Sequence, residues 1–392
     1  MTTPHQPPQA AAGHPPGWYA DPWNMKPWRW WDGETWTAHV AEAQENKPRL
    51  PSWLSVPVLI GIILTVLSML LLLAASPGPT LVGIALGFVP LFIVFPVLSW
   101  LDRVEPEPRA SRIHALLWGA AVAGLVSGIV NSIVAIGAGE AWAAVASAPL
   151  IEELTKGLGV YWALRRREVD GVMDGIVYAG WVGLGFAMIE DVLYFADAVE
   201  QGILTQVFIL RALLTPFAHP LFTAWIGLAI GLAVARRQSV AANAFWGYGL
   251  AVASHAAWNG TLTFADQTGN EWAIVVAGLC FMALFFAAVV TVILIRRSEQ
   301  RHFVALVPML AQRYQLTAEE VGVFGNWQRM LATRRALPRS RRPSFDRVHA
   351  ALARLALFYR RDGGSDPATE QLLAGQLHHA RQAQFAAEAA SG

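Results

Sequence analysis

The stretch Pro149-Leu150-Ile151-Glu152-Glu153-Leu154-Thr155-Lys156 places two adjacent carboxylates and an ammonium group inside a segment that is otherwise apolar enough to cross a membrane. Sequence rich in alanine and leucine flanks it over residues 141–148 and 158–164. A charged side chain near the centre of a bilayer costs at least ~2.5–3.5 kcal/mol, so such residues usually face the interior of a helix bundle and have a function. We therefore interpret the rest of the chain around this octapeptide.

The spacing of these three charges predicts different roles for the two acids. On a helix Lys156 lies at i+4 from Glu152 and at i+3 from Glu153, so it can neutralise one of them. Neighbouring side chains on a helix point about 100° apart, so the two carboxylates face different surroundings. The alternative interpretation, a buried ion-pair cluster that only fixes helix packing, stays open at this point.

The composition indicates a membrane protein. Of the 392 residues, 55% are hydrophobic and only 15% are charged, and the mean hydropathy is +0.39. A soluble domain carries about 25% charged residues. The net charge of +1 gives no reason to expect a nucleic acid as partner. Cys280 is the single cysteine, so no disulfide can form within the chain.

Apolar runs recur from Trp53 onward, and a transmembrane helix needs about 20 apolar residues. We predict an all-α polytopic membrane protein whose core, residues 53–297, contains about eight transmembrane helices. The predicted spans are residues 53–75, 80–101, 113–136, 141–164, 173–197, 206–235, 241–263 and 272–295. The sixth contains Arg211 and Pro216, so we expect it to be kinked or preceded by a short interfacial helix.

Lysine and arginine flank these spans on one side only. They precede the first span and follow the second, fourth, sixth and eighth, whereas the alternate loops carry none. Cytoplasmic loops are the ones enriched in these residues, which predicts a multi-pass protein of the cell membrane with both termini in the cytoplasm. The positions are Lys47, Arg49, Arg103, Arg109, Arg112, Arg165, Arg166, Arg167, Arg236, Arg237, Arg296, Arg297 and Arg301.

The amino-terminal region is polar and rich in tryptophan. Residues 1–14 are predicted to be a disordered lead, and residues 41–52 a linker. Between them, Asp32-Gly33 is a turn dipeptide flanked by aromatic runs, which predicts a small β-hairpin module over residues 15–40. The pattern Pro16-Gly17-Trp18-Tyr19-Ala20-Asp21-Pro22 followed by Trp31-Asp32-Gly33-Glu34-Thr35-Trp36-Thr37 resembles a short bacterial domain of unknown function, and the resemblance implies no activity. The aromatic residues can form a small core or a docking surface.

The carboxy-terminal region, residues 298–392, is predicted to be a helical cytosolic tail. Thr317-Ala318-Glu319-Glu320 is a helix-start signal. A basic cluster surrounds Pro338 and Pro343, and either contact with anionic lipid head groups or a solvated linker accounts for it. The cluster consists of Arg334, Arg335, Arg339, Arg341 and Arg342.

Polar side chains inside the spans are few, and they converge on one depth. They are Glu152, Glu153 and Lys156 in the fourth span, Glu190 and Asp191 in the fifth, Arg211 and His219 in the sixth, and His255 and Asn259 in the seventh. Counting ~1.5 Å per residue from the outer boundary places the acids and histidines ~10–20 Å deep, in the outer half. These spans alternate in direction, so hydropathy did not require this convergence. A shared site does.

Two glutamates and two histidines suit peptide hydrolysis. A carboxylate can act as general base on a water while histidine orients that water or donates to the leaving amine. The set Glu190, His219 and His255 can alternatively bind Zn²⁺, with a remaining glutamate as base. Asn259 can hydrogen-bond the oxyanion. An HExxH motif is absent from the sequence, so ligands would come from separate helices, and metal-free chemistry remains open. For Arg211, which lies two turns before His219, we favour a supporting pair with Asp191 or Asp197 over substrate binding.

The ordered set Glu152-Glu153-x-x-Lys156, Phe186-x-x-x-Glu190, His219 and His255-x-x-x-Asn259 resembles the PrsW family of intramembrane proteases, over about residues 80–295. That family belongs with the prenyl-protein (CAAX) endoproteases and bacteriocin-processing enzymes. The resemblance implies cleavage of a membrane-anchored protein, typically an anti-sigma factor, at the extracytoplasmic face. It also implies that Glu152 is the catalytic base. Asp191 stands where family members often have asparagine.

Three other functions compete with this interpretation. The acids and histidines could relay protons or bind a cation in an ion-coupled transporter, although no inverted repeat is obvious. The chain could instead be a CAAX-type processing protease, or an inactive scaffold that presents its tail. We expect a membrane-anchored protein substrate and membrane lipids as partners. Replacement of Glu152 by Gln separates these functions.

Overall fold

The computed structural model describes residues 17–20, 28–31, 34–41, 54–102 and 107–389. The predicted lead over residues 1–14 and nearly all of the predicted linker over residues 41–52 lie outside this range. The chain divides into two units, residues 1–51 and 52–392, and each is described by itself.

The first unit contains three short strands, β1 (Gly17–Ala20), β2 (Trp28–Trp31) and β3 (Trp36–Ala41). They form an antiparallel sheet in the order β1-β2-β3, with an irregularity between Arg29 and Trp31 where β2 pairs with β3. Trp31 is buried, and its ring meets that of Trp36 edge-on at 5.2 Å. The turn of the predicted hairpin, Asp32-Gly33, lies outside the described residues, so the hairpin itself is not confirmed.

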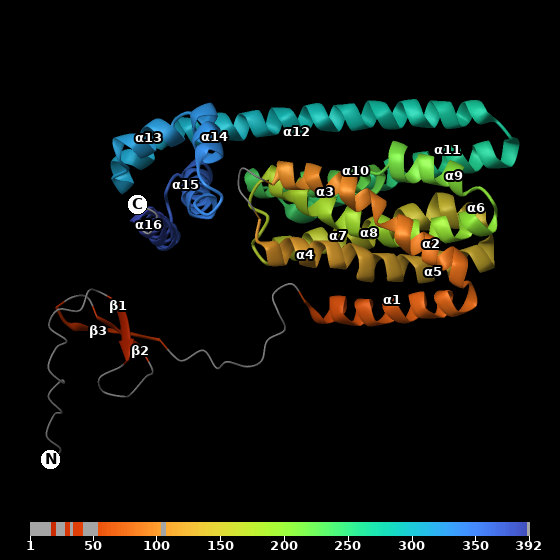
Figure 1. Ribbon diagram of the computed structural model, residues 1–392, viewed down its shortest axis with the longest axis horizontal. Coiled ribbons are helices and arrows are strands. Elements are labelled where there is room, and N and C mark those ends of the chain that lie inside the picture. Colours follow the sequence, from red (N-terminus) through yellow and green to blue (C-terminus); the bar gives the residue numbers. More distant parts are fainter. Residues whose placement is uncertain (1–16, 21–27, 32–33, 42–53, 103–106, 390–392) are drawn as a thin grey trace, which may run out of the picture. The chain divides into compact units, whose positions relative to one another are not determined.

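The second unit is helical (Figure 1). Its first part contains α1 (Val56–Ala75), α2 (Pro77–Gly87), α3 (Val89–Leu101), α4 (Arg109–Leu117), α5 (Gly124–Ala138), α6 (Glu140–Trp142), α7 (Ala148–Arg165), α8 (Val172–Glu200), α9 (Leu204–Phe208), α10 (Ala218–Ala235) and α11 (Val240–Thr268). Three π-helical segments interrupt it, η1 (Trp118–Ala123), η2 (Ala143–Ser147) and η3 (Ile209–Leu214). π-Helical turns are rare and frequently occur at functional sites.

Six helical segments in the described residues are long and apolar enough to cross a membrane: Val56–Ala75, Pro77–Leu101, Arg109–Ala138, Val172–Glu200, Leu204–Ala235 and Trp272–Tyr314. The two other predicted spans, 141–164 and 241–263, are largely helical in α7 and α11. Polar residues lower their hydropathy: α7 carries three charges within its apolar stretch, and α11 carries residues such as His255 and Asn259. The count of eight spans is therefore not confirmed.

The central helix of the bundle is α8, which packs against α10, α2, α3, α4, α7 and η1. Glycine makes these close contacts possible. At Gly183, a Cβ atom would lie 2.6 Å from the backbone nitrogen of Pro220 and 2.8 Å from the carbonyl carbon of His219. Because glycine has no side chain, α8 and α10 can approach closely here, and this approach brings His219 into the bundle interior.

The sixth predicted span is broken, as expected from its sequence. A short helix, α9, leads into η3, the helix stops at Thr215, and α10 begins at Ala218. Pro216 lies in this break and cannot donate the backbone hydrogen bond that would continue the helix. The π-helical segment carries Arg211, and α10 carries His219 in its first turn.

The last membrane helix continues into the tail. α12 (Glu271–Tyr314) runs without a break from an apolar half into the tail, and Arg296 on it donates to the carbonyl oxygens of Trp100 and Leu101 at the end of α3. The tail adds α13 (Ala318–Phe324), α14 (Trp327–Ala336), α15 (Arg342–Asp362) and α16 (Pro367–Ala389) around an apolar core that α12 shares. Thr317 caps α13 through a reciprocal pair with Glu320, which confirms that helix start.

Candidate active site

Four helices bring the predicted polar residues together inside the bundle. α7 supplies two glutamates and a lysine, α8 a glutamate and an aspartate, α10 a histidine, and α11 a histidine and an asparagine. A cavity of about 50 Å³ lies beside them between α8, η3, α10 and α11, and its lining includes Glu190, Arg211, His219, His255 and Asn259 but none of the three α7 residues. One water needs roughly 10–15 Å³ of such space, so the cavity has room for the water that hydrolysis consumes.

Lys156 is fully buried, and its ammonium group contacts two carboxylates and an aromatic ring. Its Nζ lies 2.6 Å from Glu153 Oε1 and 3.7 Å from Glu152 Oε2, and it sits 4.3 Å from the centre of the Phe186 ring. A buried ammonium requires such partners, because its desolvation must be offset by opposite charge and hydrogen bonds. The cation–π contact explains why the phenylalanine of the Phe186-x-x-x-Glu190 pattern belongs to the site.

Both carboxylate oxygens of Glu153 have hydrogen-bond partners. Besides Lys156, it accepts a hydrogen bond from the hydroxyl of Thr223 at 3.1 Å, and its Oε1 lies 3.0 Å from His255 Nδ1. A carboxylate that accepts from one imidazole nitrogen fixes the ring orientation and leaves the other nitrogen available. Glu153 therefore directs His255 Nε2 into the site and holds Lys156.

Glu152 has the opposite environment. Its Oε1 accepts a hydrogen bond from Asn131 Nδ2 at 3.2 Å, whereas its buried Oε2 has no hydrogen-bond partner among the described residues. This oxygen lies 3.7 Å from Lys156 Nζ and 3.9 Å from His255 Nε2, beyond hydrogen-bond distance of both. The two adjacent acids thus differ as their angular separation predicted: both oxygens of Glu153 are hydrogen-bonded, whereas Glu152 keeps one oxygen without a hydrogen bond.

Glu190 is held by Arg211 and His219. Its Oε2 lies 2.7 Å from His219 Nε2 and also accepts from Arg211 Nη2. Arg211 donates through Nε to Asp191 at 2.6 Å and lies over the Tyr194 ring at 3.9 Å. The pairing of Arg211 with Asp191 favoured from the sequence is therefore present. Arg211 reaches both acids from the π-helical turn η3.

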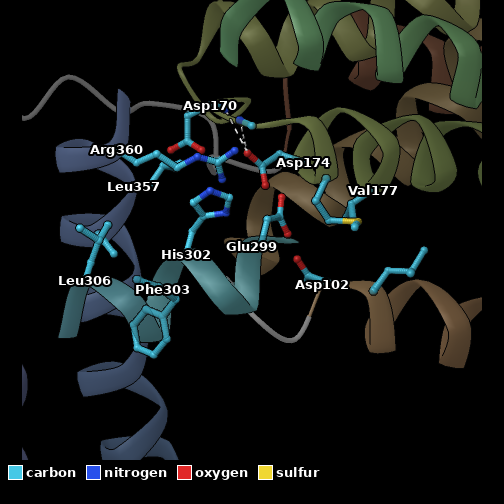
Figure 2. Close-up of a pocket in the computed structure, with 15 residues that line it drawn as sticks. Asp102, Asp170, Asp174, Val177, Glu299, His302, Phe303, Leu306, Leu357 and Arg360 are labelled. Atoms are coloured by element: carbon cyan, nitrogen blue, oxygen red, sulfur yellow. Dashed lines mark hydrogen bonds between the residues drawn. The ribbon is translucent and has the colours of Figure 1, made fainter. Parts of the chain in front are cut away.

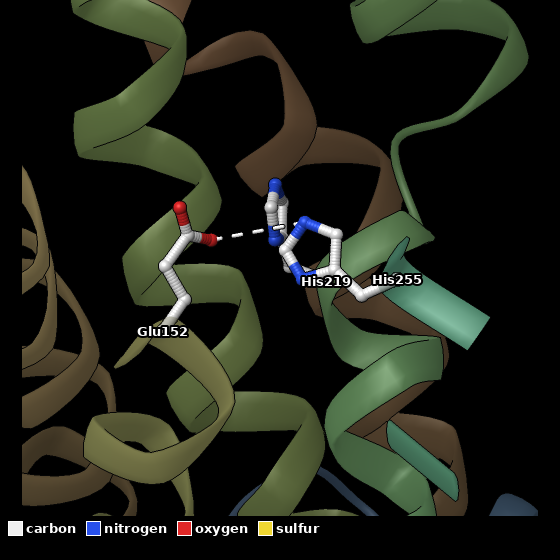
Figure 3. Close-up of side chains that lie close together, drawn as sticks. All are labelled: Glu152, His219 and His255. Carbon is white, nitrogen blue, oxygen red and sulfur yellow. Dashed lines mark ion pairs between the residues drawn. The ribbon is translucent and has the colours of Figure 1, made fainter. Parts of the chain in front are cut away.

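Glu152, His219 and His255 form a cluster that could hold a metal ion (Figure 3), in which His219 would exchange its Nδ1 contact with Lys156 Nζ at 3.2 Å, or its Nε2 contact with Glu190, for the metal. One ligand atom from each lies within 4.8 Å of the others, and all three side chains are buried. A carboxylate and two imidazoles are a common zinc donor set, and a buried carboxylate oxygen without a partner is what a missing cation would leave. From the sequence, Glu190 was expected to join these histidines. The structure groups Glu152 with them and places Glu190 between His219 and Arg211.

Asn259 lines the cavity but uses its amide for packing. Its Nδ2 donates to the carbonyl oxygen of Ala144 at 2.9 Å, within the π-helical segment η2. Sequence analysis did not single out Asn131, Ser147 or Thr223, although all three lie in or beside the network. Asn131 had a readable signal, because it is an amide inside the apolar third span. The contribution of Thr223 only becomes visible once α10 faces α7.

A separate cavity of about 70 Å³ lies where the bundle meets the tail (Figure 2). Asp102, Asp174, Glu299, His302 and Arg360 line it, and Figure 2 shows them around one space. Burial raises the pKa of Asp102 to about 6, even though its carboxylate pairs with an arginine at 2.8 Å. None of the residues that converge on Glu152 takes part in this second cavity.

The comparisons with known proteins agree with this geometry. Residues 107–294 match the model of the PrsW family intramembrane metalloprotease. The chain contains a PrsW-family domain. The matched range includes every residue of the network around Glu152. Residues 16–49 match a family of proteins of unknown function (DUF2510), as the tryptophan pattern indicated.

Two proteins named protease PrsW are similar to part of the chain. The one from Geobacillus kaustophilus (strain HTA426) is 34% identical over 154 residues, and the one from Clostridioides difficile (strain 630) is 28% identical over 148 residues. The aligned parts cover 38% and 36% of this chain, and 66% and 62% of the relatives. No solved structure matches the chain.

Proposed function

We propose that this chain is an intramembrane endopeptidase that cleaves a membrane-anchored protein with a water activated between Glu152, His219 and His255. The observation that carries the proposal is the buried Oε2 of Glu152, which has no hydrogen-bond partner among the described residues and clusters with His219 and His255 inside the helix bundle. An oxygen in this state is costly to keep unless a water, a metal ion or a substrate uses it. The PrsW-family match and the two protease relatives support the same reaction class.

Glu152, His219 and His255 are the residues that would hold a zinc ion in this enzyme. Bound zinc would polarise the scissile carbonyl and lower the pKa of water. Glu153 would keep His255 in the tautomer whose Nε2 faces the cavity, through the contact with Nδ1. Glu190, hydrogen-bonded to His219 and held by Arg211, lies in the cavity wall where it can take or return a proton. In a metal-free variant of the mechanism, Glu152 itself is the general base.

The charge distribution supports a site on the outer side of the cell membrane. With lysine and arginine loops in the cytoplasm, the chain would cross eight times with both ends inside, and α7 and α11 would be true spans that line the site. The polar residues then lie in the outer half of the bilayer. We infer a single-pass, membrane-anchored substrate, of the anti-sigma-factor kind, cut near its extracytoplasmic boundary.

Comparing membrane proteomes tests the function whatever the identity of the substrate. Cells that produce the wild-type chain should contain new protein termini, near the outer membrane boundary, that cells producing Glu152→Gln lack. The expected loss of cleavage is at least about 100-fold, since general acid–base groups contribute that much. Glu140→Gln makes the same chemical change at an exposed position and should leave cleavage intact.

Two outcomes would contradict the proposal. Equal cleavage by wild type and Glu152→Gln would reject Glu152 as the reacting group. Proton or cation flux through proteoliposomes of the purified chain, lost in Glu152→Gln while no protein is cleaved, would instead identify a transporter.

A further inference from the structure

Asn131 is a polar side chain on α5, between two exposed isoleucines. It lies in the run Ile129-Val130-Asn131-Ser132-Ile133, where Ile129 and Ile133 are 53% and 64% exposed. Asn131 itself is only half-buried. An amide at membrane depth is costly unless its donor and acceptor both find partners, so its presence on such a surface needs a reason.

Both ends of this amide are engaged, and the two bonds fix its direction. Asn131 Oδ1 accepts from the hydroxyl of Ser147 at 2.8 Å, and Asn131 Nδ2 donates to Glu152 Oε1 at 3.2 Å. Because Ser147 occupies the carbonyl end, the amino end must face the carboxylate. Ser147 is buried and belongs to η2, the π-helical segment that leads directly into α7.

This relay decides which oxygen of Glu152 is left without a hydrogen bond. With Oε1 held by the amide, the carboxylate cannot rotate freely, and Oε2 is left on the side of His255 at 3.9 Å. Glu153 is held by other residues, because its contacts come from Lys156, His255 and Thr223. The neighbouring glutamates therefore owe their different states to residues on different helices.

We propose that Asn131, oriented by Ser147, is a positioning residue that holds Glu152 through Oε1 and thereby presents Oε2 as a metal ligand beside His219 and His255. Only the catalytic use of the metal depends on the proposed peptidase function, and the positioning of Glu152 for metal binding does not. Partners that orient a metal-bound carboxylate or imidazole typically change metal affinity by about 10–100-fold when removed.

Zinc affinity of the purified full-length chain in detergent tests this role without a substrate. Zn²⁺ is titrated in competition with a chromophoric chelator against wild type, Asn131→Leu, Ser147→Ala and Glu152→Gln. We expect Asn131→Leu to weaken binding by about 10–100-fold, Ser147→Ala to weaken it less, and Glu152→Gln to weaken it most. Ser132→Ala is the matched control: its hydroxyl donates to Gly128 O within α5 and is exposed, so zinc affinity should not change.

Thermal unfolding without zinc separates positioning from a folding defect. A positioning role predicts that Ser147→Ala keeps the apo melting temperature of wild type while its zinc affinity falls, and this variant decides the question if Asn131→Leu does not fold. Unchanged zinc affinity in Asn131→Leu or in Ser147→Ala would overturn the proposal. So would a wild-type chain that binds no zinc, and in that case cleavage in the Glu152→Gln comparison still judges the peptidase independently.

Discussion

The helix bundle and the carboxy-terminal tail differ in how deeply their ion pairs are buried. In the bundle, Lys156 and Glu153 are completely buried and paired at 2.6 Å. In the tail, the pair of Arg334 and Asp346 has the same length, 2.6 Å, yet both side chains are about one-third exposed or more. A buried pair stabilises only as a complete network, whereas an exposed pair contributes little either way. Equal distances therefore carry very different consequences.

The same contrast holds for histidine. In the bundle, His219 and His255 each contact a carboxylate and line a polar cavity. In the tail, His349 packs edge-on against Phe303 at 5.3 Å, and its Nε2 has no hydrogen-bond partner among the described residues. Burial lowers the pKa of His349 to about 4. A buried histidine alone thus does not indicate a site, and convergence with acids does.

Removing the buried cation should have the largest effect. Lys156→Met leaves Glu152 and Glu153 close together without their shared counter-charge, and we expect a loss of about 3–5 kcal/mol of stability. The measurement is the midpoint of unfolding in detergent. Leu154→Met, on the same helix but 47% exposed, is the control and should change little. A Lys156→Met variant as stable as wild type would mean that the network does not hold the bundle together.

Acid should destabilise the tail through His349. The folded tail keeps this imidazole neutral, whereas the unfolded chain binds a proton below its ordinary pKa of 6.5. Stability is therefore complete above about pH 6.5 and falls as the pH drops toward 4, by up to about 3 kcal/mol. Hydrogen exchange of tail peptides in the full chain at several pH values measures this. His349→Phe should flatten the pH dependence, and an unchanged slope would contradict the assignment.

Filling the contact between α8 and α10 should disturb the site with a smaller loss of stability. In Gly183→Ala the new methyl group would press on Pro220, so α10 must shift and carry His219 away, at a cost of about 1–3 kcal/mol. Zinc affinity and the unfolding midpoint should both fall. Gly128→Ala is the control, because a Cβ there meets no atom within 4 Å. Equal effects of the two substitutions would show that helix propensity, and not the close contact, is responsible.

Breaking the exposed pair should have the smallest effect. Arg334→Met removes the partner of Asp346 in the tail, and we expect a loss of about 0.2–1 kcal/mol that becomes smaller in high salt. The unfolding midpoint at two salt concentrations measures it beside Lys156→Met. A loss as large as that of Lys156→Met would remove the distinction between the two regions.

The sequence by itself determined the class of protein and the helix-forming segments, and it predicted most of the residues that converge in the candidate site. Long apolar runs leave a chain few options in lipid other than helices, and polar residues inside such runs must face inward. This reasoning identified Glu152, Glu153, Lys156, Glu190, His219 and His255 before any contact was known. It also anticipated the break near Pro216, because proline cannot donate the hydrogen bond that continues a helix.

Only the tertiary structure decided which partner each of these residues has. In the sequence, Glu152 and Glu153 are two identical neighbouring residues. In the structure, the amide of Asn131 contacts Glu152. Glu153 is contacted instead by Lys156, His255 and Thr223. The tertiary structure also places Glu152, and not the expected Glu190, in the cluster with the two histidines. Spacing along one helix fixes direction to within a turn, but a hydrogen bond depends on ångström-scale distances between helices, which packing sets.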